Sequence, residues 1–481
     1  MVGTISNYHF LTAFRSFEEK CLKQQNGANT RCRFAVLSSL NHLEQCTYVI
    51  MIFAKYIEKE KLLMNEHLRR WAAILICITF MMLMLPQPSL AKTPFDLNAK
   101  AAILVDAKTG KILYEKNAEQ SLPVASMSKM MTQYVVLNQI KEKKLSWDDV
   151  YKAQEIDQLL STKPGLSNIP LYQGEEYTLK ELYDSMMIVS ANASSRALGE
   201  MAGKTDKQFV QMMNEQAKQL KLHNSYFVNT SGLNNEDIHP YEVKGTNPTD
   251  ENHMSAKDLA LLAYHLTKEF PEELAVETTE TKPFYITDNL VIDMVNTNEM
   301  LPGGKYPYEG ILGMKTGMNK AAGHGFTGHV KRGDIELISV VIGGQTKDGK
   351  PSSKARFMET KKLLDYGFKQ WECQSVNPAD YTQQPNVEKG KQETIAIDTT
   401  NKSCMMIPKT ADQQPKGKLH LNEESMQAPI EKGKKLGTME LTGPTEQYLT
   451  PELKKQATIN IVAKESVEKE NWFILLWKSI F

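Results

Sequence analysis

The chain has 481 residues, more than one ordinary domain holds, so two or three domains are expected. Its 57 basic and 57 acidic residues balance, which argues against bulk electrostatic binding of nucleic acid. It contains no C-x-x-C pair and no H-E-x-x-H segment, so we expect neither a metal site nor a cofactor.

The first predicted element is a secretory signal peptide over residues 64–91. Arg69 and Arg70 precede an apolar run, residues 71–85, which helix breakers and a small-residue end then follow. A membrane span needs about twenty apolar residues, so this shorter run favours cleavage after Ala91 over an uncleaved anchor helix.

Residues 1–63 fit this prediction poorly, because a signal peptide belongs at the start of the translated protein. We therefore expect translation to start at Met64 and residues 1–63 to be a non-native or unstructured extension. A genuine cytoplasmic extension is the alternative. After cleavage only Cys373 and Cys404 remain, and the sequence leaves open whether they form a disulfide.

The mature chain opens with a predicted β-hairpin. Two apolar runs, residues 101–105 and 111–114, flank Lys108, Thr109 and Gly110. This pattern is typical of two strands joined by a turn, so we assign this K-T-G triplet to the turn.

A predicted helix that begins near Ser126 carries the pattern S-x-x-K, with Lys129 as its lysine. Residues three apart share a helix face, so the amine would stand beside the serine hydroxyl. A serine nucleophile needs such a base, and a helix N-terminus favours a developing anion. Taken alone the pattern is common: Ser466 and Lys469 repeat it, and Lys129 would then be a surface cation.

The following helix is predicted to start at a capping box, Thr178 with Glu181, and to end near Ser190. Ser190 and Asn192 place a hydroxyl and a carboxamide close together, either as site residues or as helix caps. Further capping boxes predict helices that start after Thr205 and Ser255.

A second K-T-G triplet, Lys315, Thr316 and Gly317, ends a strand-like run over residues 310–314. Two more strand-like runs follow, at residues 325–330 and 335–342. Together with the hairpin and the helix-rich middle, they predict an α+β fold in which helices gather against an antiparallel sheet.

The composition changes near Cys373, where polar residues and prolines become frequent. Short alternating runs at residues 393–397 and 435–441 predict a small all-β domain. Residues 472–481 are apolar and aromatic, but ten helical residues reach only about 15 Å, half of a bilayer core. We expect this amphipathic tail to lie in a membrane interface rather than to dock on the protein.

The order S-x-x-K, S-x-N, K-T-G is a known pattern of β-lactamases and penicillin-binding proteins. From Phe95 to its end the chain resembles the low-molecular-mass penicillin-binding proteins, the serine-type D-Ala-D-Ala carboxypeptidases. The segments that carry this resemblance are residues 125–132, 227–233, 313–317, 322–328 and 359–368.

The resemblance implies a β-lactamase/transpeptidase-like domain followed by a small all-β domain and the tail. The predicted boundaries are 1–63 for the extension, 64–91 for the signal peptide, 92–372 for the penicillin-binding domain, 373–463 for the β-domain and 464–481 for the membrane-anchoring helix.

It also implies roles for residues. Ser126 would be the nucleophile, Lys129 its base, and Ser190 a proton relay to the leaving amine. Burial and the like charge of Lys315 would keep Lys129 neutral. Substrate binding would fall to Asn192, Lys315, Thr316, Gly317, Met318 and Arg356, with the backbone amides of Ser126 and Met318 as oxyanion donors. Arg356 would face the substrate carboxylate, unless it is only a charge on a helix surface.

The implied reaction removes the last D-alanine from the peptidoglycan stem pentapeptide through a serine acyl-enzyme, which limits cross-linking. β-Lactams would acylate the same serine. The implied location is the outer face of the bacterial cytoplasmic membrane, reached by export. The sequence leaves open the muropeptide preference, a transpeptidase or endopeptidase side activity, a vegetative or sporulation role, and the oligomeric state.

Two other functions would share some of these features. A class A β-lactamase shares the three motifs, but no E-x-x-L-N-like segment lies between Asn192 and Lys315, and such enzymes lack a C-terminal β-domain. A non-catalytic wall-binding protein would keep the fold, but it would not need the intact motifs.

Overall fold

The computed structural model of the chain describes residues 95–480, except 288, 376, 381–383, 400–403, 411–415, 424–425 and 444–445. The predicted signal peptide, its cleavage after Ala91 and the extension over residues 1–63 lie outside the described residues. The described residues belong to one compact unit.

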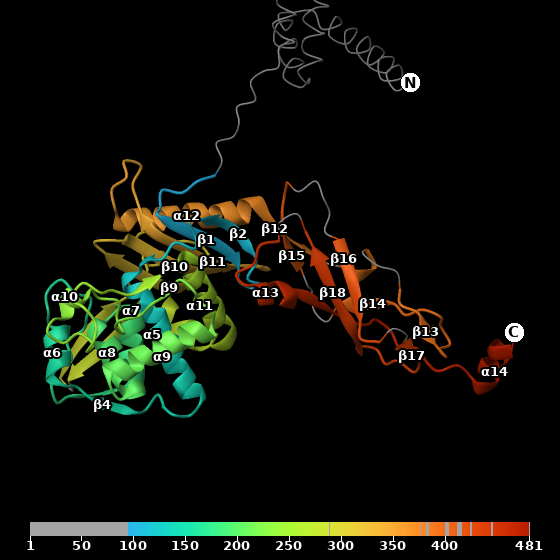
Figure 1. Ribbon diagram of the computed structural model, residues 1–481, viewed down its shortest axis with the longest axis horizontal. Helices are drawn as coiled ribbons and strands as arrows, with labels where there is room; N and C mark the ends of the chain where they lie inside the picture. Colours follow the sequence, from blue (N-terminus) through green and yellow to red (C-terminus); the bar gives the residue numbers. More distant parts are fainter. Residues whose placement is uncertain are drawn as a thin grey trace, which may run out of the picture. The chain divides into compact units, whose positions relative to one another are not determined.

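The largest sheet among the described residues has five antiparallel strands in the order β2-β1-β11-β10-β9 (Figure 1). Its strands are β1 (Ala101–Asp106), β2 (Ile112–Lys116), β9 (Ile311–Asn319), β10 (Gly323–Arg332) and β11 (Ile335–Gly344). The predicted hairpin and the two later strand runs are therefore confirmed. The sheet joins the start of the described chain to a segment more than two hundred residues later, because Ala101 pairs with Ile342.

Both faces of this sheet are buried, and they alternate with the period of two that a strand imposes. Ile103, Ile338 and Val340 face the core on the side of α11 (Ala256–Glu269), which packs on β1 and β11. The intervening residues belong to a second core on the side of α12 (Ser353–Gln370). In Figure 1, α12 and α11 lie on opposite sides of the strands.

A group of helices builds the rest of the larger core. These helices are α5 (Lys129–Lys141), α6 (Glu155–Ser161), α7 (Leu179–Ile188), α8 (Asn192–Gly203), α9 (Asp206–Gln219) and the short α10 (Asn235–Ile238). The predicted caps are confirmed: Thr178, Thr205 and Ser255 each accept a backbone N–H bond from the first turn of their helix.

Short strand pairs and 3-10 turns connect these elements. The pairs are β3 (Leu122–Pro123) with β6 (His253–Met254), β4 (Val150–Lys152) with β5 (Glu176–Thr178), and β7 (Thr281–Thr287) with β8 (Leu290–Val295). The 3-10 turn η1 (Ala125–Ser128) leads directly into α5, and η2 (Glu273–Thr278) packs against β9.

After α12 the described chain is mainly β-structure with its own core. Its elements are β12 (Trp371–Ser375), η3 (Pro378–Asp380), β13 (Val387–Glu388), β14 (Ile397–Thr399), β15 (Cys404–Pro408), β16 (Lys416–Leu421), β17 (Met426–Gln427), β18 (Lys435–Thr442), α13 (Pro451–Gln456) and β19 (Thr458–Ala463). A four-stranded sheet has the order β14-β19-β18-β16. Cys373 and Cys404, whose pairing the sequence left open, form a disulfide between the paired strands β12 and β15.

Two strand predictions need correction. The run over residues 310–314 does not end before Lys315, because β9 continues to Asn319 and its ladder with β10 extends to the pair Asn319 and Gly323. The run over residues 393–397 forms a strand only from Ile397, where pairing with β19 begins.

The chain ends in α14 (Trp472–Ile480), which has nine residues. Its aromatic rings are largely exposed: Trp472 is 64% exposed and Trp477 is 66% exposed. Within the described part of the chain, we find no helix that is long and apolar enough to cross a membrane.

Candidate active site

Ser126 and Lys129 meet where η1 becomes α5. The turn and the first helical residue continue one another, so the two side chains share one face. The side-chain nitrogen Nζ of Lys129 lies 2.9 Å from Oγ of Ser126. It also donates to Oδ1 of Asn192 and to the carbonyl of Ser231, at 2.8 Å each. The lysine is therefore fixed against the hydroxyl rather than free on a surface.

Lys129 is completely buried. This burial lowers its pKa well below the usual 10.5, and the charge of Lys315 lowers the pKa further. Both effects disfavour the cationic form, so the site maintains an amine that is able to accept a proton.

Ser190 and Asn192 lie in the tight connection between α7 and α8. Ser190 has a φ of +64°, a conformation that non-glycine residues rarely adopt, and its Oγ is buried with no hydrogen-bond partner among the described residues. Neither residue acts as the side-chain cap of α8, since Oδ1 of Asn168 accepts from the amides of Asn192 and Ala193 at 2.9 Å. The helix-cap alternative is wrong.

Asn192 has both ends of its carboxamide bound within the protein. Oδ1 accepts from Lys129, and Nδ2 donates to the carbonyl of Ser167 at 2.9 Å. In this arrangement the side chain holds the lysine in place, in addition to any contact with a substrate.

Lys315 and Thr316 stand on β9 beside this group. Lys315 is fully buried, and desolvation together with the charge of Arg356 lowers its pKa to about 7. The hydroxyl of Thr316 donates to that of Thr297 at 2.9 Å, and the amide of Thr297 donates to the carbonyl of Ile188 at 3.1 Å. These two bonds tie the second K-T-G triplet to the connection that carries Ser190.

Gly317 lets β9 approach the nucleophile. A Cβ atom there would lie 2.6 Å from the carbonyl oxygen of Val124 and 3.2 Å from the amide nitrogen of Met127, which flank Ser126. The next residue, Met318, is 62% exposed, so the end of the triplet opens to solvent.

Nη1 of Arg356 donates to the carbonyl of Gly317 at 3.3 Å. Arg356 is therefore held against the end of the triplet and is not a free charge on the helix surface.

Sequence reasoning missed several groups that hold the site together. The carbonyl of Ser231 fixes Lys129, and Gly232 is required because a Cβ atom would lie 2.0 Å from the carbonyl oxygen of Ala125. Nδ2 of Asn252 donates to Oγ of Ser128 at 2.9 Å, inside η1. A backbone acceptor leaves no trace in residue identity. The segment 227–233 did stand out by resemblance, but the sequence assigned it no role.

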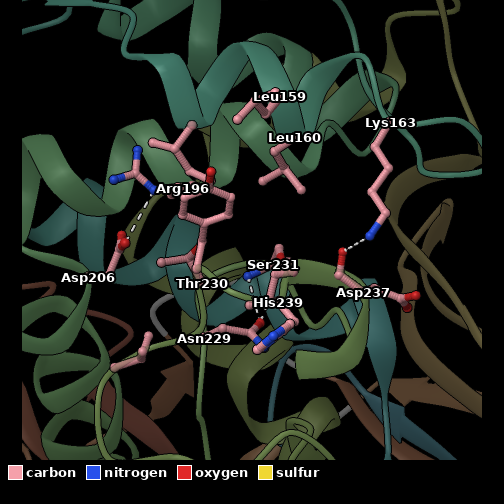
Figure 2. A pocket seen from close by; sticks show the side chains of 14 residues that line it. Leu159, Leu160, Lys163, Arg196, Asp206, Asn229, Thr230, Ser231, Asp237 and His239 are labelled. Atoms are coloured by element: carbon pink, nitrogen blue, oxygen red, sulfur yellow. Dashed lines mark hydrogen bonds and ion pairs between the residues drawn. The ribbon is translucent and has the colours of Figure 1, made fainter.

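A separate pocket lies beyond the loop that carries Ser231 (Figure 2). Leu159 and Leu160 of α6 form one wall, and residues 229–231 and 237–243 form the other. Lys163 closes one side by donating to the carbonyl of Asp237, and Arg196 pairs with Asp206 at 3.2 Å on the other side. The pocket therefore adjoins the segment that positions Lys129, without being lined by the three motifs.

Two family models match the chain. A model described as D-alanyl-D-alanine carboxypeptidase matches residues 87–346, and one described as penicillin-binding protein 5, C-terminal domain, matches residues 375–469.

Curated proteins give a similar result. D-alanyl-D-alanine carboxypeptidase DacF of Bacillus subtilis is 31% identical over 386 residues, which cover 79% of this chain and 89% of that protein. D-alanyl-D-alanine carboxypeptidase DacC of Escherichia coli is 28% identical over 388 residues, 79% of this chain and 87% of that protein.

Two solved structures share the fold. A peptidoglycan synthesis regulatory factor (PBP3) from Streptococcus pneumoniae superposes with a TM-score of 0.70 at 29% identity, covering 78% of this chain and 100% of that one. Penicillin-binding protein 5 from Haemophilus influenzae gives a TM-score of 0.57 at 25% identity, covering 78% and 99%.

Proposed function

Because this chain belongs to the D-alanyl-D-alanine carboxypeptidase family, we propose that Ser126, Lys129 and Ser190 are the catalytic residues of its serine peptidase site. The family predicted from the motifs and the α+β fold are confirmed. The protein is a serine-type carboxypeptidase that removes the terminal D-alanine from peptidoglycan pentapeptides, and it binds penicillin covalently.

One observation carries the assignment: a buried amine lies 2.9 Å from the serine hydroxyl and has its pKa lowered by burial and by a second lysine. In the first step Oγ of Ser126 attacks the carbonyl of the penultimate D-alanine while Lys129 takes its proton. Ser190, whose buried hydroxyl has no partner among the described residues, passes a proton to the leaving amine and takes up in its place the proton that Lys129 received from Ser126. The peptide bond breaks, D-alanine departs, and water then hydrolyses the ester.

The second K-T-G triplet binds the substrate in this proposal. Among the described residues β9 is an edge strand, so an extended peptide has a strand to pair with. Lys315 and Arg356 present two cations to the substrate carboxylate, and Thr316 offers a hydroxyl. The amides of Ser126 and Met318 would stabilise the oxyanion, each by about 3 kcal/mol.

The test is incubation with a muropeptide pentapeptide followed by mass analysis, with fluorescent penicillin labelling in parallel. We expect the loss of one alanine and a single labelled species, and we expect Ser126→Ala to abolish both. Ser466→Ala is the matched control, because Ser466 starts the other S-x-x-K pattern and should keep full labelling. Labelling of Ser126→Ala would disprove the nucleophile, and peptide dimers would instead indicate transpeptidation.

We also propose that the protein is exported after cleavage behind Ala91 and works at the outer face of the cytoplasmic membrane. Support comes from the signal-like composition of residues 64–91 and from the exposed aromatic side chains of α14. N-terminal sequencing of the mature protein should begin at Lys92. A start at Met1 would overturn the export proposal.

Membrane binding by α14 has its own test. The full mature chain should float with anionic lipid vesicles, whereas a variant with serine at Trp472, Phe473 and Trp477 should stay behind, since those rings are 64–66% exposed. Equal flotation of both proteins would exclude α14 as the anchor.

A further inference from the structure

A carboxyl group lies buried behind the second K-T-G triplet. Glu277, in η2, is 1% exposed. Its Oε1 accepts a 3.0 Å hydrogen bond from Nε2 of Gln133 on α5, and its Oε2 has no hydrogen-bond partner among the described residues. An unpaired oxygen on a buried carboxyl group is costly, so the position of this one needs a reason.

The backbone of β9 makes room for this carboxyl group. A Cβ atom at Gly313 would lie 2.4 Å from Oε2 of Glu277, so the carboxylate faces the strand two residues before Lys315. Asn296 holds η2 in place by donating from Nδ2 to the carbonyls of Glu277 and Thr279, at 3.2 and 2.9 Å. The carboxyl group is thus positioned by tertiary contacts from three segments.

The neighbouring charges are mostly positive. Lys315 on β9 lies close enough to Lys129 on α5 to lower the pKa of Lys129, and Arg356 on α12 lowers the pKa of Lys315. The charge of Arg356 also lowers the pKa of His324 on β10. On the other sides Tyr183 of α7 bonds Gln133 and the carbonyl of Glu273, and Glu299 lies near Arg356.

Within this cluster, Glu277 is the carboxylate that raises the pKa of Lys315 against burial and Arg356. In return, Lys315 lowers the pKa of Glu277, which burial raises to about 7. No direct ion pair joins these two described residues, so the interaction acts across the buried interior, where screening is weak.

We propose that Glu277 is a positioning residue whose negative charge keeps Lys315 protonated, so that Lys315 binds the substrate carboxylate and repels a proton from Lys129. This inference rests on the proposed function, and it adds a fourth ionisable group to the two lysines and the arginine of the site.

The test compares the pH dependence of penicillin acylation, as a second-order rate constant, in the full mature protein and in Glu277→Gln. Glutamine keeps the shape and can still accept from Gln133, but it removes the charge. We expect the alkaline limb of the rate–pH profile to move to lower pH by about one unit. At a given pH on that limb the acylation rate then falls about tenfold, whereas the acid limb changes little.

Two further variants make the test specific. Gln133→Met leaves Glu277 in place but removes its hydrogen bond, so it should move the same limb in the same direction by less. In the Lys315→Arg background, adding Glu277→Gln should leave the alkaline limb at the same pH, because a guanidinium stays charged without a neighbouring carboxylate. Asp258→Asn is the matched control, since Asp258 is also a buried carboxylate but stands in the first turn of α11, where it accepts from Asn224 and Ser225, and it should leave the profile unshifted.

The outcomes distinguish an electrostatic role of Glu277 from a structural one. A uniformly lower rate with an unshifted limb in Glu277→Gln would mean a purely structural role and would overturn the inference. So would a shift that persists in the Lys315→Arg background. If the wild type neither labels with penicillin nor releases D-alanine, the proposed function itself fails, and the two failures are thereby distinguished.

Discussion

Two lysines of the same site have different tasks because their surroundings differ. Lys129 is fixed by Ser126, Asn192 and the carbonyl of Ser231, and burial is the main cause of its lowered pKa. Among the described residues, the hydrogen bond found for Nζ of Lys315 is a long one, 3.5 Å to the carbonyl of Thr316, so its ammonium is less firmly held. The first suits a base, and the second suits a binding cation.

This difference predicts that arginine is tolerated at position 315 but not at position 129. Lys129→Arg should lose about 10²–10⁴-fold in acylation, since a guanidinium stays protonated and cannot accept the proton of Ser126. Lys315→Arg keeps its charge and should lose much less. Stopped-flow acylation by penicillin measures both variants, and equal losses would contradict the division of roles.

The pH profile follows from the same two groups. Acylation should rise with pH as Lys129 loses its proton, because burial and Lys315 place its pKa below 10.5. Lys315, with a pKa of about 7, then loses its charge, so the KM for a pentapeptide should increase above about pH 7. Separate kcat and KM measurements across pH provide the check, and a KM that stays flat would argue against Lys315 as the carboxylate ligand.

At this scale the sequence was informative wherever side-chain chemistry and helical spacing coincide. Ser126 and Lys129 are three residues apart, so the helix alone brings them together. The carbonyl of Ser231 and the carboxyl group of Glu277 act from distant segments, and neither belongs to a short motif. Only tertiary packing brings them to the site.

Among the elements, β9 and η1 depend on each other. The strand that carries Lys315 presses against the turn that carries Ser126, and Gly317 is the point of contact. This contact explains why the triplet ends in a glycine although the strand continues to Asn319.

Gly317→Ala should therefore separate the strand from the turn. The added Cβ atom would meet backbone atoms of Val124 and Met127, and such overpacking costs about 1–3 kcal/mol. We expect a lower Tm. We also expect a loss of penicillin labelling that is larger than the loss of folded protein can explain.

Gly367→Ala is the control. The nearest atoms to a Cβ atom there are the flexible side-chain ends of Leu104 and Leu337 under α12, and no atom of η1 is among them. It should change Tm without changing acylation. If both variants label alike at a temperature where both are folded, the contact of β9 with η1 is not what orders the site.

The element predictions succeeded where local signals were strong and failed where pairing decided the outcome. Thr178, Thr205 and Ser255 cap their helices as their sequence context indicates. The predicted end of β9 was wrong because the length of this strand is set by its ladder with β10. A short stretch of sequence does not show which strand will pair with it.

In the whole molecule, Lys111 lies where the sheet meets the C-terminal β-structure. It is 1% exposed, and its Nζ donates to the carbonyl of Met406 at 3.0 Å. Burial lowers its pKa to about 8. Between that value and the usual 10.5, the unfolded chain binds more protons than the folded protein, so stability from this group rises with pH.

Lys111→Met should remove that dependence. The difference in Tm between the wild type and the variant should grow in favour of the wild type from about pH 8 to pH 10, since the buried cation becomes neutral only in the wild type. Differential scanning calorimetry at several pH values provides the measurement. A difference that is constant over this range would place Lys111 in contact with water.

The order of the strands in the sheet was not predictable, because β1 pairs with β11 across most of the domain and no local pattern encodes that choice. The α+β class was predictable, since it needs only the kinds of elements present. The composition change near Cys373 likewise indicated separate β-structure without revealing how it attaches.

That attachment matters for anyone who trims the protein. Leu449 donates its amide to the carbonyl of Gly110, and Leu453 of α13 packs where a Cβ atom at Gly110 would stand. A recombinant fragment that stops at residue 372 would expose the tip of its first hairpin and strip Lys111 of its acceptor. Kinetics measured on such a fragment would describe a loosened enzyme, and inhibitor screening is better served by the uncut mature chain.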